Sequence, residues 1–186
     1  MRKVSTGLFC SVDGVVGEPY RFQFDSFDDE LGAALTAFMA STTAGILGRT
    51  SYEEWADHWP RMAPDSGDPF AAFINPLPKY VASRTLRGPL AWQNSTLVDG
   101  DLVEFVRDLK QTDGGDVAVF GSISVVRQLL FAGVLDELQL MVHPVIAGDG
   151  QRLFRAGDPT TRLSLVRSDT TSAGNVLVTY AVRPPA

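Results

Sequence analysis

The sequence predicts an α/β protein whose central sheet is parallel in its middle and antiparallel at one edge. As far as residue 146, short apolar runs alternate with segments of helical spacing, which is typical of parallel strands joined by crossover helices. Two alternating segments then follow, Leu163–Asp169 and Val176–Val182, joined by a glycine-containing turn like an antiparallel hairpin. We expect residues 1–186 to form a single domain, because no linker divides them.

The chain opens with a predicted strand and a predicted helix. Lys3–Val12 is rich in apolar and β-branched residues and stops at Asp13-Gly14, a turn-forming pair. Apolar residues recur at helical spacing from Leu31 to Met39. The acidic run Asp28–Glu30 precedes them, and acidic side chains suit the positive N-terminal end of a helix.

The second strand and second helix are predicted next to each other. Residues 43–48 form an apolar run that leads directly into Thr50-Ser51-Tyr52-Glu53. This pattern predicts a capping box, in which Thr50 and Glu53 satisfy amides at the start of a short helix that ends before Pro60. Phe70–Asn75 is expected to form one further helical turn.

Two short strands and a helix are predicted in the middle of the chain. Lys79–Ser83 is expected to be the third strand and Leu90–Trp92 a short fourth. Leu102–Leu109 has one apolar face, and Asp101 stands at the position of a helix N-cap.

The last parallel unit follows. Residues 116–120 form a strand, and a helix starts at Ser122 or Ser124 and ends at Gly133, a residue suited to a left-handed C-terminal conformation. Leu138–Ile146 is expected to be a long strand ended by Gly148-Asp149-Gly150, which we interpret as a turn.

Composition and charge exclude several classes of partner. Sixteen basic and 22 acidic residues give a net charge of −6, which argues against a surface that binds nucleic acid or an acidic membrane. Two or three local arginines would still suffice for one phosphate group. Cys10 is the single cysteine and lies in an apolar run, which favours a buried, inert thiol.

The sequence gives no sign of a membrane span or a secretion signal. No stretch approaches the roughly 20 apolar residues that a membrane-spanning helix needs. Polar residues, among them Ser5 and Asp13, interrupt the segment that would have to be the apolar core of a signal peptide. We therefore expect a cytoplasmic protein.

One pattern, a strand end followed directly by a helix start, occurs three times. A strand-like run ends at Gly or Ser, and a polar residue that could start a helix follows, as in Gly48-Arg49-Thr50, Ser83-Arg84 and Gly121-Ser122. Ligands of open α/β sheets bind outside the carboxyl ends of parallel strands, where helix N-termini offer free N–H groups to anions. The pattern predicts a site for a phosphorylated nucleotide, although each glycine could also serve only as a tight turn.

Four motifs in a fixed order carry a resemblance to a known family. They are Ser11-Val12-Asp13-Gly14; Gly48-Arg49-Thr50-Ser51-Tyr52-Glu53; Lys79-Tyr80-Val81-Ala82-Ser83-Arg84; and Val117–Ser122, continued by Gly133–Leu138, Pro144-Val145, Gly148-x-Gly150 and Leu153-Phe154. With them, residues 1 to about 155 resemble the dihydrofolate-reductase-like superfamily. Within it, the chain is similar to the reductase domain of bacterial bifunctional riboflavin-biosynthesis deaminase/reductases, as a stand-alone relative.

The resemblance implies a three-layer fold with helices on both faces of the mixed sheet. It also implies a reductase that binds NADPH and passes hydride from nicotinamide C4 to a small planar heterocycle, which is pteridine-, pyrimidine- or flavin-precursor-like. It further implies a homodimer, since relatives pair through sheet edges, and the apolar strand 138–146 could serve. The cofactor-binding residues that it implies are Gly48, Arg49, Thr50, Ser83, Arg84, Val119, Gly121, Ser122 and Ile123. Among them, Arg84 would meet the 2′-phosphate, for which a guanidinium is well shaped.

Two groups of residues are candidates for catalysis and substrate binding. Asp13 follows the first strand where the nicotinamide should lie and could supply a proton; equally, it could be a turn residue bonded to its own backbone. Trp55, Trp59, Phe73 and Pro144 could wall a slot for a planar ring, with plain core packing as the alternative. His58 and His143 stand alone, so no metal site is expected.

The sequence departs from the riboflavin-pathway reductases at one informative position. Those enzymes commonly carry Glu-Gly-Gly where this chain has Phe120-Gly121-Ser122. The missing carboxylate indicates a relative whose substrate has diverged. It also motivates an alternative function, a binding module or ligand sensor of the same fold that keeps the nucleotide site and has lost turnover.

Overall fold

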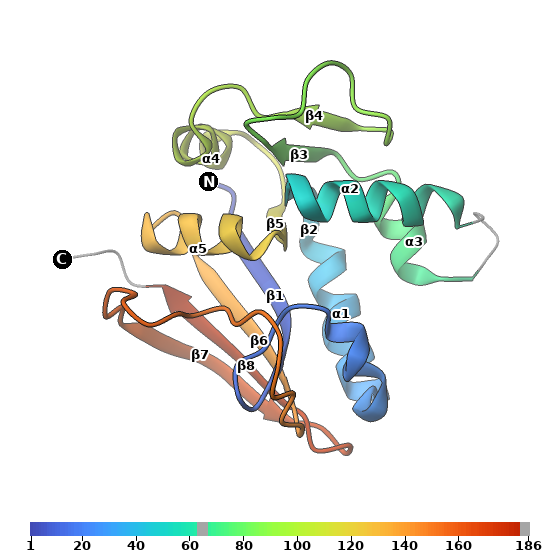
Figure 1. The fold of residues 1–186 in the computed structure, drawn as a ribbon, viewed down its shortest axis with the longest axis vertical. Coiled ribbons are helices and arrows are strands. Elements are labelled where there is room, and N and C mark those ends of the chain that lie inside the picture. Colours follow the sequence, from blue (N-terminus) through green and yellow to red (C-terminus); the bar gives the residue numbers. More distant parts are fainter. Residues whose placement is uncertain (63–66, 183–186) are drawn as a thin grey trace.

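A computed structural model describes residues 1–62 and 67–182 (Figure 1). Its eight strands are β1 (Val4–Ser11), β2 (Thr42–Gly48), β3 (Lys79–Ala82), β4 (Ser95–Leu97), β5 (Asp116–Gly121), β6 (Glu137–His143), β7 (Leu163–Thr170) and β8 (Val176–Val182). The α-helices are α1 (Asp29–Ser41), α2 (Arg49–His58), α3 (Pro69–Ile74), α4 (Leu102–Gln111) and α5 (Ile123–Phe131). Short 3₁₀ helices occupy Pro19–Arg21, Gln23–Ser26 and Trp59–Arg61.

All eight strands form one mixed sheet in the order β4-β3-β2-β5-β1-β6-β8-β7. The first six strands of this order pair in parallel, and β8 and β7 add antiparallel pairs at one end. In Figure 1 strands β3 and β4 lie near the top of the molecule and the β7–β8 hairpin near the bottom. The predicted sheet, parallel in the middle with antiparallel C-terminal strands, is confirmed.

Helices cover both faces of the sheet, as expected from the resemblance. Successive residues of a strand point to opposite faces. In β2, Ile46 packs in one buried cluster with residues of α4 and α5, whereas Leu47 packs in a second cluster with Tyr52 of α2 and Ile74 of α3. The sheet is therefore the middle layer of three.

The helices begin in two different ways. Helices α1, α3 and α4 each start behind an aspartate, Asp28, Asp68 and Asp101, whose carboxylate accepts hydrogen bonds from amides of the first turn. Helices α2 and α5 start behind Gly48 and Ser122, and neither N-cap residue caps its own helix through a side chain. Because α2 already begins at Arg49, the capping box predicted at Thr50 does not form.

Two strand predictions need correction. The fourth strand is Ser95–Leu97, not Leu90–Trp92. The Trp92 ring is buried beside Tyr52, and its indole N–H donates to Asn75. The apolar residue at this position therefore reflects side-chain burial and not pairing in the sheet. Strand 138–146 ends earlier, at His143, and it is hydrogen-bonded to β1 on one side and β8 on the other. It therefore offers no free edge to a second subunit.

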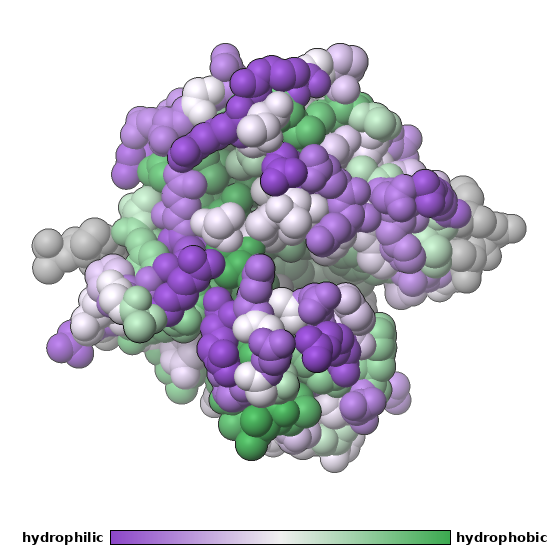
Figure 2. All heavy atoms as spheres, in the orientation of Figure 1, coloured by the Kyte–Doolittle hydropathy of each residue, from purple (hydrophilic) through white to green (hydrophobic). Residues whose placement is uncertain are grey.

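The surface is mostly polar on the face drawn in Figure 2, and hydrophobic residues gather at its lower edge. The large apolar side chains that are exposed include Val12, Phe24 and Ile146. Within residues 1–62 and 67–182, none of the helices combines the length and the apolar character needed to cross a membrane.

Candidate functional site

The carboxyl ends of three neighbouring parallel strands bring the predicted cofactor residues to one edge of the sheet. Gly48 at the end of β2 is in register with Ala82 of β3, and Leu47 is in register with Gly121 of β5. Ser83 and Ser122 directly follow the neighbouring ends. The three motifs at the ends of β2, β3 and β5 therefore lie close together, because parallel strands end on the same side of a sheet.

The starts of α2 and α5 are packed closely against each other. The backbone N–H and the hydroxyl of Ser51 both donate to Ser122 Oγ at 3.3 Å. A Cβ atom on Gly48 would lie 2.6 Å from Ser122 Oγ, and one on Gly121 would lie 2.6 Å from Ser51 Oγ. Gly121 also has φ = 137°, a conformation that favours glycine. Glycine at both strand ends is what allows the two helix starts to approach.

This arrangement leaves main-chain donors at the edge of the sheet. In α5 the first helical hydrogen bonds run from the N–H groups of Val125 and Val126 to the Ser122 carbonyl, so the amides of Ile123 and Ser124 have no acceptor within the helix. No side chain of the helix start caps them. Free amides at a helix N-terminus suit a phosphate group.

The remaining predicted cofactor side chains lie at the surface around this edge. Thr50 and Arg49 are exposed, and the Arg49 guanidinium pairs with Glu53 at 2.8 Å. Arg84 is exposed too, and within the described residues its guanidinium makes no hydrogen bond or ion pair. The Ser83 hydroxyl accepts hydrogen bonds from the N–H groups of Thr85 and Leu86 and so fixes the turn that carries Arg84.

Val119 does not belong to the candidate site. Its side chain is fully buried in the core cluster shared with α4 and α5, and its carbonyl accepts a hydrogen bond from the Thr6 hydroxyl at 2.7 Å. Because side chains alternate along a strand, Val119 points to the face covered by α4 and α5, whereas Phe120 points to the face of α2 and α3. The prediction that Val119 contacts the cofactor is wrong for its side chain.

Asp13 is not suited to give up a proton. Its carboxylate accepts hydrogen bonds from the Ser11 hydroxyl and from the N–H groups of Ala147 and Gly148, and it pairs with Arg152 at 3.0 Å. The Ser11 hydroxyl first, and then the backbone N–H groups, lower the pKa of Asp13 from 3.8 to about 2. A catalytic acid needs the opposite shift. The alternative, a residue that holds a turn, fits the structure.

An aromatic cluster flanks the site on the side of α2 and α3. Trp55 packs against Trp59, Phe70 and Phe120 with ring centroids 5.6–6.2 Å apart, and Phe73 lies 6.0 Å from Phe120. All five rings are partly buried around the second core cluster. Since these rings fill the space between one another, core packing is their main role, with their remaining exposed edges free to meet a ligand.

Pro144 lies elsewhere. It follows β6, which is separated from β2 and the aromatic cluster by β5 and β1, and it sits next to Gly174. The prediction that Pro144 and the tryptophans share one slot is therefore wrong. The reason is strand order: residues at the carboxyl ends of the same sheet can still lie several strands apart.

His143 belongs to a buried polar cluster that ties the β7–β8 hairpin to the segment before α1. Its Nδ1 atom lies 2.7 Å from Ser26 Oγ, and Asn175 bonds both the hydroxyl and the carbonyl of Ser26. Burial lowers the pKa of His143, while the charge of Asp28 opposes that shift. In the part of the chain that the structure describes, no three His, Cys, Asp or Glu side chains are placed to hold a metal ion.

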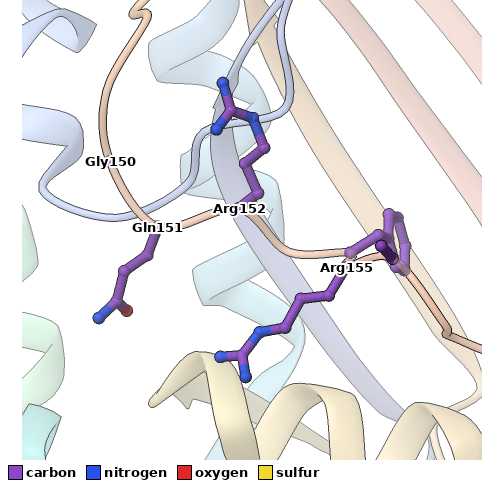
Figure 3. A pocket seen from close by; sticks show the side chains of 6 residues that line it. Gly150, Gln151, Arg152 and Arg155 are labelled. Atoms are coloured by element: carbon purple, nitrogen blue, oxygen red, sulfur yellow. The ribbon is translucent and has the colours of Figure 1, made fainter.

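The sequence reasoning missed the loop after β6. Gly150, Gln151, Arg152 and Arg155 line a pocket of about 370 Å³ together with Phe154 and Ala156 (Figure 3). We interpreted Gly148-Asp149-Gly150 only as a turn. The available signal was the pair of arginines that follow it, spaced three residues apart.

The comparison with known families identifies the chain. The sequence profile of the RibD C-terminal domain matches residues 2–177, almost the whole length. The protein belongs to this family. The uncharacterized protein YyaP of Bacillus subtilis (strain 168) is 26% identical over 181 residues, which is 96% of this chain and 94% of YyaP.

Solved structures share the fold of this RibD C-terminal domain. A Shewanella sp. PV-4 protein named for riboflavin biosynthesis has a TM-score of 0.75 and 18% identity over 98% of this chain and 99% of its own. The pyrimidine reductase-like protein of Corynebacterium diphtheriae gives 0.66 and 14% over 99% and 93%. A Thermotoga maritima deaminase/5-amino-6-(5-phosphoribosylamino)uracil reductase gives 0.66 and 15%, with 98% of this chain spanning 57% of that protein. The dihydrofolate-reductase-like fold expected from the motifs is confirmed.

Proposed function

We propose that the protein is an NADPH-dependent reductase that transfers hydride to a small planar heterocycle, with a pyrimidine-like ring as the favoured class. The observation that carries the proposal is the junction of Gly48–Ser51 with Gly121–Ile123, where two helix starts without a cap from their own N-cap side chains meet at adjacent strand ends. The uracil reductase activity in the name of the Thermotoga protein supports the substrate class.

The residues at the junction fit a dinucleotide. A Cβ atom on Gly48 or Gly121 would collide with the hydroxyl of Ser122 or Ser51, so glycine at both positions lets the two helix starts meet at the ends of β2 and β5. The amides of Ile123 and Ser124 would hold a phosphate group, and Arg84, on the turn fixed by Ser83, would hold the 2′-phosphate. Bound NADPH supplies the hydride from nicotinamide C4.

The protein's own contribution is binding and orientation, and the proton comes from solvent. Asp13 holds the loop 147–152 and stays ionised, so it does not donate. The exposed edges of the aromatic cluster around Trp55 and Phe120 would lie against the flat ring of the substrate. Placing the two reactants against each other then supplies most of the rate enhancement.

Titration with NADPH while tryptophan fluorescence is recorded tests the cofactor. We expect saturable quenching, since Trp55 lies on helix α2, which begins at the junction, and Trp59, which packs against Trp55, directly follows that helix. The Arg84→Gln variant should bind NADPH about tenfold more weakly and NADH equally well, because one charge-assisted contact with the 2′-phosphate is lost.

Arg162→Gln is the matched control, since Arg162 is exposed, lies outside the proposed site and undergoes the same change of charge. Wild-type protein that binds neither NADPH nor NADH at saturating concentration would refute the proposal. An Arg84→Gln variant whose affinity for NADPH and for NADH falls by the same factor would refute the role of Arg84.

A second candidate is a binding module that holds the nucleotide without turnover. Two observations favour it: Phe120 stands where the riboflavin-pathway reductases commonly carry a carboxylate, and the Asp13 carboxylate is fully engaged in holding a loop. NADPH oxidation, followed at 340 nm in a screen of pyrimidines, pterins and flavin precursors, decides between the two. Oxidation that depends on one of these compounds eliminates the binding module.

A further inference from the structure

A pocket of about 370 Å³ lies on the loop between β6 and β7, within residues 150–156. Its six lining residues include two arginines and a glutamine, and no acidic residue is among them. Figure 3 shows Gln151 and Arg155 extending from the loop on either side of an open space, with helix α5 passing below. Two guanidinium groups and a carboxamide in one lining can donate hydrogen bonds to an anionic group.

The arginines of this region differ in what they already bind. Arg127 of α5 is paired with Asp158 through both of its terminal nitrogens at 2.6 Å. Arg152 bonds the carboxylate and the carbonyl of Asp13 and the carbonyl of Gly148. Within the described residues the Arg155 guanidinium makes no hydrogen bond or ion pair, and Arg155 is exposed, although its charge helps to lower the pKa of Asp158. All of its N–H donors are therefore available to a ligand.

The loop is fixed at both ends although its surface is open. Asp13 anchors Ala147, Gly148 and Arg152, and the Gln151 carbonyl accepts hydrogen bonds from Val16 and Gly17. Arg127 holds the Leu153 carbonyl at 2.8 Å and, through Asp158, the N–H of Arg155. Because the backbone of the loop is already fixed, binding through Arg155 has to immobilise its side chain but not the loop.

The anchors also place the loop next to the proposed cofactor site. Arg127 is one turn from Ile123, the first residue of α5, and the crossover helix runs from the carboxyl edge of the sheet towards its amino edge. Gln151, which precedes the Leu153 anchor and is tied to the segment after β1, therefore lies towards the carboxyl edge, where Ser122 and Ile123 begin α5.

We propose that Arg155, assisted by Gln151, binds a phosphate of the cofactor's diphosphate from the side opposite the first turn of α5. This inference rests on the proposed function and adds a cofactor-binding residue to it. The Arg155 guanidinium would donate two N–H groups to phosphate oxygens, and the Gln151 carboxamide a third. The phosphate of a phosphorylated substrate has the same chemistry and is the source that the test must separate.

Calorimetric titration of wild type and Arg155→Gln with three fragments makes this separation. ADP-ribose carries the diphosphate, 2′-AMP carries only the phosphate proposed for Arg84, and ribose 5-phosphate represents a substrate phosphate. We expect Arg155→Gln to bind ADP-ribose and NADPH about tenfold more weakly and 2′-AMP unchanged, because one charge-assisted contact is lost. Arg84→Gln should show the reverse pattern for ADP-ribose and 2′-AMP.

Arg162→Gln, an exposed arginine further along the same loop, controls for the change in net charge. Arg155→Lys keeps the charge and should lose less affinity than Arg155→Gln. Unchanged affinity of Arg155→Gln for ADP-ribose, with wild type binding NADPH, overturns this inference alone. A loss confined to ribose 5-phosphate assigns the pocket to the substrate and likewise overturns it. Wild type that binds neither NADPH nor ADP-ribose overturns the proposed function as well.

Discussion

Asp13 illustrates how far a single residue can be interpreted from sequence. Its place after the first strand was compatible with a proton donor and with a turn residue. The Ser11 hydroxyl, two positions away, does most to lower its pKa, but the partners that tie the carboxylate to a distant loop, Ala147, Gly148 and Arg152, lie more than 130 positions away in the chain. A hydrogen-bond network of such long range cannot be deduced from local pattern.

The Asp13 carboxylate should make the stability of the protein depend on pH in the acid range. Because its folded pKa is lowered to about 2 from 3.8, the ionised form is favoured by folding, and this contribution is complete above pH 3.8 and lost as the pH falls through about 2. We expect Asp13→Asn to be less stable than wild type at pH 5, with a difference that shrinks between pH 4 and pH 2.

Urea unfolding curves at several pH values measure this difference. A constant gap between wild type and Asp13→Asn from pH 5 to pH 2 would contradict the assignment. So would an Asp13→Asn protein as stable as wild type at pH 5.

At the scale of elements, the five helices divide by how they begin. An aspartate starts three of them, whereas the two at the candidate site begin at Gly48 and Ser122. The Asp101 cap was predictable because it is local. The capping box at Thr50 was not formed, since the N-cap of α2 is Gly48, two residues earlier, and its first turn packs against Ser122.

The close approach of α2 and α5 predicts a steric effect at Gly48. Its φ of −79° is open to alanine, so Gly48→Ala acts only through the contact of its Cβ with Ser122, and we expect a loss of about 1–3 kcal/mol in unfolding free energy. Removing the opposing side chain in Gly48→Ala/Ser122→Gly should restore part of this loss.

Gly7→Ala is the control for this experiment, because a Cβ there meets its nearest neighbour, Met141 Cε, at an ordinary 3.6 Å. Chemical denaturation of the four proteins gives the comparison. Equal losses in Gly7→Ala and Gly48→Ala, or no recovery in the double variant, would show that the approach of the two helices is not what requires glycine.

Most strands were predictable from their apolar composition and from the turn residues that end them. The exception, β4, has a physical reason. Strand β4 contains Ser95 and Thr96 and is recognisable only by its pairing with β3. The apolar stretch before it, Leu90–Trp92, is buried by side-chain packing alone. Apolar patterning reports burial, and burial need not mean a place in the sheet.

At the scale of the whole molecule, strand order is the property that the sequence left open. Local signals identified β6 as a strand but could not place it between β1 and β8. For the same reason we predicted that Pro144 and the tryptophans share one pocket, although β5 and β1 lie between β6, which Pro144 follows, and β2, which precedes the tryptophans. Order in a sheet depends on long-range pairing, which one sequence does not encode in any short segment.

A homodimer stays a prediction, and the strand order changes where it would form. The two edges of the sheet are β4 and β7, and β7 exposes Leu165 and Val166. Exposed apolar residues on an edge strand favour pairing with another chain. Sedimentation equilibrium should give about twice the chain mass of 20.1 kDa for a dimer, and Leu165→Lys should shift the protein towards the monomer. A wild type of 20 kDa at micromolar concentration would contradict it.

Phe120 bears on the search for the natural substrate. Its ring contacts Phe38, Trp55, Phe70 and Phe73 and covers Gly45 of β2. An apolar aromatic surface therefore occupies the position where the riboflavin-pathway reductases commonly carry a carboxylate. A hydroxyl-rich sugar would have to shed its hydration there without compensation. A substrate screen should therefore favour uncharged, apolar heterocycles over heterocycles that carry a sugar.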